Sequence, residues 1–136
     1  MPRFSLRYDG DLRVHAVHDP SGTALITDAP VDNHGRGESF SPTDLVATGL
    51  GACMFTLMGI RAKQAGWPLA GATVAVEKHM SAQPPRRIAR LVLRFSLPAA
   101  IPAKARAQLE QAAHTCPVAL SIHPDIQVET RFAYDR

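Results

Sequence analysis

The sequence predicts an α+β domain, because segments with strand periodicity surround one long apolar helix and two shorter helical segments. Apolar and polar residues alternate in the first part of the chain, with turn signals at Asp9-Gly10 and at 19–22. We therefore expect strands at 4–8, 12–16, 23–27, 74–80, 91–97 and 126–134. Helices are expected at about 42–65, 103–114 and 117–122. The predicted order is β-β-β-α-β-β-α-α-β.

The long helix has clear start and stop signals. Ser41 can cap its N-terminus, Pro42 suits the first helical position, and Asp44 occupies the acidic position of a capping box. Gly66 is typical of a helix stop. The helix is apolar nearly all round, so we expect burial on most of its sides. Its small residues favour close packing against a second helix, which can belong to another subunit: Ala47, Gly49, Gly51 and Ala52.

Composition limits the classes of function. With 136 residues, 46% of them hydrophobic and 20% charged, the chain fits a single globular domain over 1–136. Its formal charge of +3 is mild, and no basic stretch alternates with aromatic residues, so nucleic-acid binding is not expected. The uncharged run over 45–60 is shorter than a membrane span of about 20 residues. No leader is recognised, which indicates a reducing cytoplasm, where disulfides are usually transient or catalytic.

The two cysteines are the candidate reactive groups. Cys53 lies well inside the long helix, where the default interpretation is a buried cysteine acting as a small hydrophobe. Its reactivity would need a cation from elsewhere in the fold, and Arg13 and Arg36 are the candidates. Cys116 directly precedes Pro117, so it can lie at a helix N-terminus, where unpaired N–H groups favour a thiolate. The alternative is that Cys116 is a small structural residue at a helix junction.

The sequence contains little that indicates a metal site, a phosphate-binding site or a serine nucleophile. His114 and Cys116 are two positions apart, but no second cluster with zinc-ligand spacing accompanies them. The glycines at 49 and 51 lie inside a helix and do not form a phosphate loop, and no nucleophile-elbow motif is present. We therefore expect no metal and no cofactor.

Two motifs resemble the OsmC/Ohr family of thiol-dependent hydroperoxide reductases. The first is the segment 41–53, Ser-Pro-Thr-Asp-Leu-Val-Ala-Thr-Gly-Leu-Gly-Ala-Cys, and the second is Cys116-Pro117-Val118. The expected order of strands and helices is similar to the family's along nearly the whole chain. The resemblance implies an OsmC-like fold with antiparallel sheets around a buried central helix, assembled as an intertwined homodimer.

The resemblance also implies roles for individual residues. Cys53 would attack the peroxide and become a sulfenic acid, Cys116 would condense with it to a disulfide, and an external dithiol would reduce that disulfide. Members of the family activate the thiolate with an arginine from the early strands, as Arg13 would be, or from the loop before the helix, as Arg36 would be. We favour Arg36.

One position departs from the family pattern. Thr43 stands where the well-studied branches place a glutamate that holds the arginine. Asp44 is next to it, but helix capping explains Asp44 without catalysis. Thr43 and Asp44 are therefore candidate binding residues, and the carboxylate partner of the arginine is left unassigned.

The hypothesis from sequence is a cytoplasmic, homodimeric, antioxidant thiol peroxidase that reduces organic hydroperoxides. One alternative is an OsmC-like dimer that binds a small hydrophobic ligand through unreactive cysteines. Another is a purely structural dimer. The distance between the two sulfur atoms separates the first hypothesis from these alternatives, because a disulfide needs them in contact.

Overall fold

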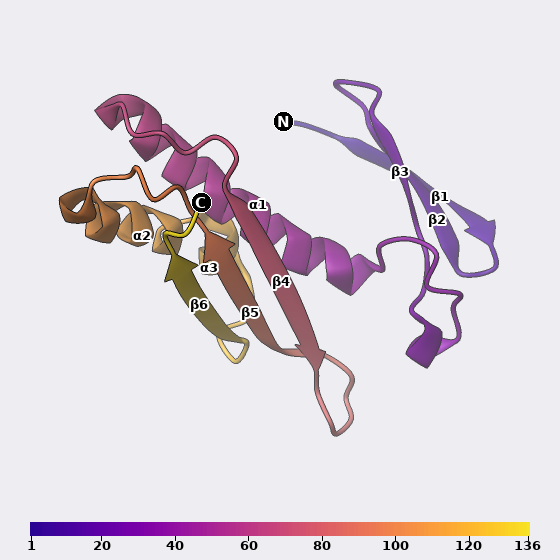
Figure 1. Cartoon of the computed structure of the whole chain (residues 1–136). Helices are drawn as coiled ribbons and strands as arrows, with labels where there is room; N and C mark the ends of the chain where they lie inside the picture. The colour runs from indigo at the N-terminus through magenta and orange to yellow at the C-terminus, as the bar shows by residue number, and fades with distance from the viewer. The chain divides into compact units, whose positions relative to one another are not determined.

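The computed structural model describes residues 1–136 and confirms the predicted α+β order, with two short 3₁₀ helices in addition (Figure 1). The chain divides into two compact units, Met1–Val46 and Ala47–Arg136. Each unit is described by itself below. The expectation of a single domain over 1–136 stays a prediction.

The N-terminal unit is built on an antiparallel sheet. Strands β1 (Phe4–Gly10), β2 (Arg13–His18) and β3 (Ala24–Thr27) pair in the order β1-β2-β3, as Figure 1 shows in indigo and violet. The structure confirms a strand where the sequence alternates, and side chains at every second position of a strand share a face. Phe4, Leu6 and Tyr8 therefore lie on one face of β1. These three side chains are nevertheless exposed. The apolar face that the pattern predicts therefore exists and is open to solvent in this structure.

A tightly bonded loop follows β3 and includes the 3₁₀ helix η1 (Val31–Asn33). Its two ends are joined because the Asp28 N–H donates to the Phe40 carbonyl at 3.1 Å. Gly35 has no room for a side chain, since a Cβ atom there would lie 1.8 Å from the Ala29 carbonyl oxygen. The loop is thus fixed at its base, and it holds Arg36 near its middle.

Helix α1 (Pro42–Ala65) begins with the predicted capping box. The Asp44 N–H donates to Ser41 Oγ at 3.1 Å, and the Ser41 N–H donates to Asp44 Oδ2 at 2.9 Å. Gly66 follows the last turn with a φ of +77°, the left-handed conformation that glycine adopts readily. Both ends of the helix are therefore determined by local sequence.

The C-terminal unit contains a mixed sheet in the order β4-β5-β6, with β5 in the middle (Figure 1). Strands β4 (Thr73–Met80) and β5 (Ile88–Ser96) are antiparallel, as predicted. Strand β6 (Gln127–Ala133) joins β5 in parallel, so this sheet is not wholly antiparallel. The connection between β5 and β6 contains η2 (Ala103–Ala105), α2 (Arg106–His114) and α3 (Pro117–Ser121). A crossover of this length is what a parallel pair requires.

The central strand β5 is more buried than the alternation suggests. Strand alternation from the apolar Leu91 and Leu93 would place Val92 on the opposite, polar face with Arg90 and Arg94, but Val92 is fully buried. It lies between Glu77 and Glu129 of the neighbouring strands. Arg94 pairs with Glu77 at 2.8 Å and Arg90 pairs with Glu129 at 3.2 Å. The aliphatic stems of these long side chains can cover a small apolar residue, which explains the burial of Val92.

Helix α1 packs on this sheet along one stripe, not on most of its sides as expected. The stripe consists of Ala47, Leu50, Gly51, Met54, Met58 and Ala62. It joins a core that includes Leu93 of β5 and Leu109 of α2. Val46 and Ile60 remain exposed. The expectation of burial on most sides is thus wrong for the single chain, because apolar residues occupy more of the helix surface than the sheet covers.

By length and composition α1 would also suit a membrane span. A buried core helix meets the same criteria, and α1 presents a buried stripe. The absence of a membrane interaction stays a prediction.

Candidate functional site

The fold brings the two cysteines into contact. Cys53 lies on α1 and Cys116 lies at the N-cap of α3, and their side chains are close enough to form a hydrogen bond. Both are free thiols, so the structure describes the reduced form of the pair. The two thiols are thus neighbours in the fold, which is the arrangement that a disulfide between them would require.

Apolar packing produces this contact. Cys116 is completely buried in the same core as Met54 of α1 and Leu109 and Ala113 of α2. Cys53 is partly buried and packs against that core from α1. The residues that bury α1 and α2 against each other therefore also place the two thiols side by side, with Cys53 as the more accessible one.

The protonation of Cys116 differs from the expectation. It does occupy the N-cap, with the Ala119 N–H donating to its Sγ at 3.3 Å. Burial nevertheless raises the pKa of the Cys116 thiol, and the adjacent Cys53 side chain adds to the rise, while the Ala119 N–H opposes it. Helix α3 has only five residues, so its dipole is small and gives a Cys116 thiolate little stabilisation. Cys116 is therefore a protonated thiol at neutral pH, and not the thiolate that its position suggested.

The two candidate arginines lie together in the N-terminal unit, where they share a carboxylate. Arg13 of β2 forms an ion pair with Glu38 and a second with Asp28 at 3.6 Å. Arg36 lies 3.9 Å from Glu38. The Arg13 side chain is 32% exposed and that of Arg36 is 70% exposed, so Arg13 is the more firmly held of the two.

Neither carboxylate of this cluster was predicted from the sequence. The carboxylate partner of the arginine was expected near Thr43, whereas Glu38 lies in the preceding loop and Asp28 lies directly after β3. The Asp28 side chain is 1% exposed, accepts the Glu38 N–H at 3.0 Å through Oδ2, and has no hydrogen-bond partner at Oδ1. The position of Asp28, an acidic residue directly after an apolar strand, was the one sequence feature that could have indicated this pairing. An aspartate at such a position is equally typical of a turn.

Thr43 and Asp44 are engaged at the start of α1. Asp44 completes the capping box, as predicted, and Thr43 Oγ1 lies 3.2 Å from Ser41 Oγ. Their assignment as binding residues stays a prediction.

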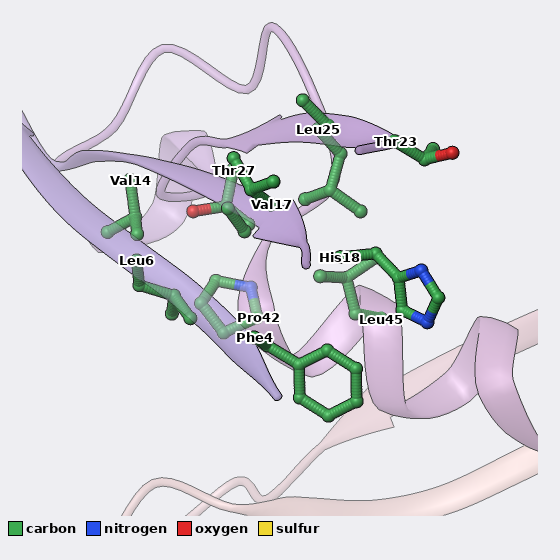
Figure 2. Close-up of a pocket in the computed structure, with 12 residues that line it drawn as sticks. Phe4, Leu6, Val14, Val17, His18, Thr23, Leu25, Thr27, Pro42 and Leu45 are labelled. Atoms are coloured by element: carbon green, nitrogen blue, oxygen red, sulfur yellow. The ribbon is translucent and has the colours of Figure 1, made fainter. Parts of the chain in front are cut away.

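The N-terminal unit also contains an apolar cavity of about 390 Å³ (Figure 2). Figure 2 shows Leu6, Val14 and Leu25 around it, together with Pro42 and Leu45 from the start of α1. Phe4 stacks on the His18 ring at a centroid distance of 5.6 Å. The wall is almost entirely hydrocarbon, which suits an apolar group and not a charged ligand.

No group of three or more His, Cys, Asp or Glu side chains is placed to hold a metal ion.

The structure thus combines an α+β fold with two free thiols that lie close together, one on α1 and one at the N-cap of α3. The family model for OsmC-like proteins matches residues 35–131, and the chain belongs to the OsmC-like family. Comparison with functionally curated proteins found no match.

Solved structures agree with this family. A protein from Psychrobacter arcticus 273-4, described as a candidate osmotic stress induced and detoxification response protein, is 44% identical, with a TM-score of 0.91 over 97% of this chain and 96% of its own. An organic hydroperoxide resistance protein OsmC from Legionella pneumophila is 18% identical, with a TM-score of 0.77 over 98% and 96%. An OsmC-like protein from Mycoplasma pneumoniae is 13% identical, with a TM-score of 0.82 over 100% and 98%. The last two show the fold alone.

The raised pKa of Cys116 predicts a loss of stability at alkaline pH. An unfolded cysteine titrates at about pH 8.5, whereas the buried thiol keeps its proton to higher pH, so the free energy of unfolding falls as pH rises above about 8.5. In Cys116→Ala this fall should be smaller between about pH 8.5 and 10. Urea titrations at several pH values measure it, with Thr115→Ala as the control. Parallel pH profiles for wild type and Cys116→Ala would contradict the assignment.

Proposed function

We propose that this protein is a cysteine-based thiol peroxidase that reduces organic hydroperoxides. The observation that supports the proposal is the contact between the Cys53 and Cys116 side chains. Some solved relatives of similar fold are named organic hydroperoxide resistance proteins, among them those from Legionella pneumophila and Elizabethkingia anophelis. The family and the thiol pair together favour this reaction over other thiol chemistry.

The proposed cycle balances with these two residues and a dithiol. The Cys53 thiolate attacks the peroxide O–O bond, which breaks, and the alkoxide takes a proton and leaves as an alcohol. Cys53 is then a sulfenic acid. The Cys116 sulfur attacks it, the S–S bond forms, and the hydroxyl leaves with the Cys116 proton as water. An external dithiol reduces the disulfide by two exchange steps and is itself oxidised.

The surroundings of the two thiols support this division of roles. Cys53 is partly exposed, so a peroxide can reach it, whereas Cys116 is completely buried. Burial raises the pKa of Cys116, which keeps it as a thiol until the sulfenic acid has formed next to it. Cys53 is therefore assigned as the attacking residue and Cys116 as the resolving one.

We assign Arg13, in place of the initially favoured Arg36, as the cation that activates Cys53. Arg13 has two carboxylate contacts and is half as exposed as Arg36. A guanidinium fixed in this way can present its remaining N–H groups to a thiolate without a large loss of side-chain entropy. Arg13 and Cys53 belong to different compact units, and the proposal includes that the assembled protein brings them together.

The proposed assembly is an intertwined homodimer. In the N-terminal unit, the exposed apolar side chains of β1 and the cavity in Figure 2 form more uncovered apolar surface than isolated residues would. In the C-terminal unit, Ile60 of α1 is exposed as well. Contiguous apolar surface on a protein usually marks an interface. A second copy of this chain is the partner that both the family and these surfaces favour. A cytoplasmic location and an external dithiol reductant belong to the same proposal.

A second candidate function is binding of a small hydrophobic ligand without catalysis. The apolar cavity of about 390 Å³ favours it, since its size falls within the range of small-molecule sites. The peroxidase assay below separates the two functions.

Wild type should consume cumene hydroperoxide in the presence of a dithiol such as dihydrolipoamide. Cys53→Ser should lose this activity by a factor of about 1,000 or more, because the nucleophile is removed. Cys116→Ser should still react once and form a sulfenic acid that dimedone traps. Equal consumption by all three proteins would eliminate the enzyme and leave the ligand-binding alternative.

Replacing Arg13 with Ala should slow alkylation of Cys53 by iodoacetamide at neutral pH, by about tenfold, because a nearby cation favours the thiolate. Arg36→Ala should have a much smaller effect, and Arg7→Ala, which removes an exposed arginine paired with Asp9, should have none. The reaction is followed by mass spectrometry in a Cys116→Ser background. If Arg36→Ala slows alkylation more than Arg13→Ala does, the assignment returns to Arg36.

Leu6→Glu should weaken the dimer, because it places a charge on the apolar face of β1, where Leu6 is 67% exposed. Ser5→Glu introduces the same side chain on the opposite face of the strand and is the matched control. Analytical ultracentrifugation over a range of concentrations gives the dissociation constants. A wild-type monomer, or equal dissociation constants for the two variants, would count against this interface.

A further inference from the structure

We infer that Asp28 is a positioning residue that fixes the orientation of Arg13, in a chain where Thr43 occupies the place of the family's glutamate. The inference rests on the proposed function, in which Arg13 activates Cys53. It assigns to a buried aspartate the role for which the sequence offers no residue near the start of α1.

The backbone holds Asp28 rigidly. Its own N–H donates to the Phe40 carbonyl at 3.1 Å, and its Oδ2 accepts the Glu38 N–H at 3.0 Å. Asp28 thus ties the end of β3 to the far side of the loop that precedes α1. Its carboxylate is consequently fixed before any contact with Arg13 is considered.

The buried carboxylate of Asp28 needs a cation next to it to be stable in its charged form. A buried carboxylate is strongly disfavoured unless it is paired and hydrogen-bonded. The Asp28 side chain is 1% exposed, and Arg13 Nη2 lies 3.6 Å from its Oδ2. The Arg13 side chain is itself two-thirds buried, so water screens this pair less than it screens pairs at the surface.

Glu38 accepts a hydrogen bond from Arg13 Nη2, whereas the contact of Asp28 with the same nitrogen is an ion pair at 3.6 Å, but Glu38 makes its contact from an exposed position. Its side chain is 56% exposed, and it is shared between Arg13 and Arg36. Exposed ion pairs contribute little to order, because solvent and salt compete with them. The orientation of the guanidinium is therefore assigned to the buried Asp28, and the exposed Glu38 contributes little to it.

The geometry leaves the arginine free to act. Both carboxylate contacts of Arg13 use the same nitrogen, Nη2. Neither carboxylate contact uses the N–H groups on Nε and Nη1. We propose the Cys53 thiolate and the peroxide oxygen as their acceptors. An arginine held along one edge and open along the other suits fork-like binding of an anion.

Asp28→Asn separates this role from a structural one. The asparagine carbonyl can still accept the Glu38 N–H, so the loop keeps its bond, while the charge that holds Arg13 is lost. Asp9→Asn is the matched control, since it removes an exposed aspartate that pairs with Arg7 in the same unit. Glu38→Gln tests the exposed anchor and changes no buried group.

Each variant is made in a Cys116→Ser background and is characterised by two measurements. The first is the rate of Cys53 alkylation by iodoacetamide at neutral pH. The second is the ¹⁵N NMR heteronuclear NOE of the Arg13 Nε–H group, assigned with Arg13→Lys. The NMR signal reports the order of Arg13 whether or not Arg13 affects Cys53.

Asp28→Asn should lower the NOE of Arg13 and slow alkylation by about three- to tenfold, and it should have no further effect in an Arg13→Ala background. Glu38→Gln and Asp9→Asn should leave Arg13 ordered. An unchanged NOE in Asp28→Asn, an additive effect with Arg13→Ala, or loss of order in Glu38→Gln would overturn the inference. If Arg13→Ala alone leaves alkylation unchanged, the proposed activation fails, and the NOE still decides the role of Asp28.

Discussion

The packing of α1 on the β4–β5–β6 sheet is the interaction on which the rest of the C-terminal unit depends. One stripe of α1, from Ala47 to Ala62, shares a core with β5 and α2. At Gly51 the helix comes so close to β4 that a Cβ atom would lie 3.1 Å from Val76 Cγ2. Because Cys53 lies beside this stripe and Cys116 lies within the same core, hydrophobic packing brings the two thiols close together.

Burial then distinguishes two thiols that are chemically identical. The completely buried Cys116 has a raised pKa and keeps its proton, while the partly exposed Cys53 is open to reagents. The charged groups of the proposed reaction are concentrated instead in the N-terminal unit, around Arg13. This separation keeps the charge of Arg13 out of the apolar core, where burying it would be costly.

Local signals in the sequence were sufficient for much of the fold. Ser41 and Asp44 predicted the start of α1, Gly66 predicted its end, and the alternation predicted β4 and β5. Features that depend on distant residues were missed. The parallel pairing of β6 and the burial of Val92 arise from neighbouring strands, and the pairing of Arg13 with Asp28 and Glu38 joins positions 15 to 25 residues apart. No period or motif encodes such contacts.

The proposed reaction requires a disulfide that forms within one chain, between Cys53 and Cys116. The most direct test treats the reduced protein with one equivalent of cumene hydroperoxide and then measures the intact mass and the cross-linked peptides under non-reducing conditions. The account predicts a chain that is lighter by two hydrogen atoms, with the Cys53 and Cys116 peptides joined. Unreacted thiols, or a disulfide only between different chains, would contradict it.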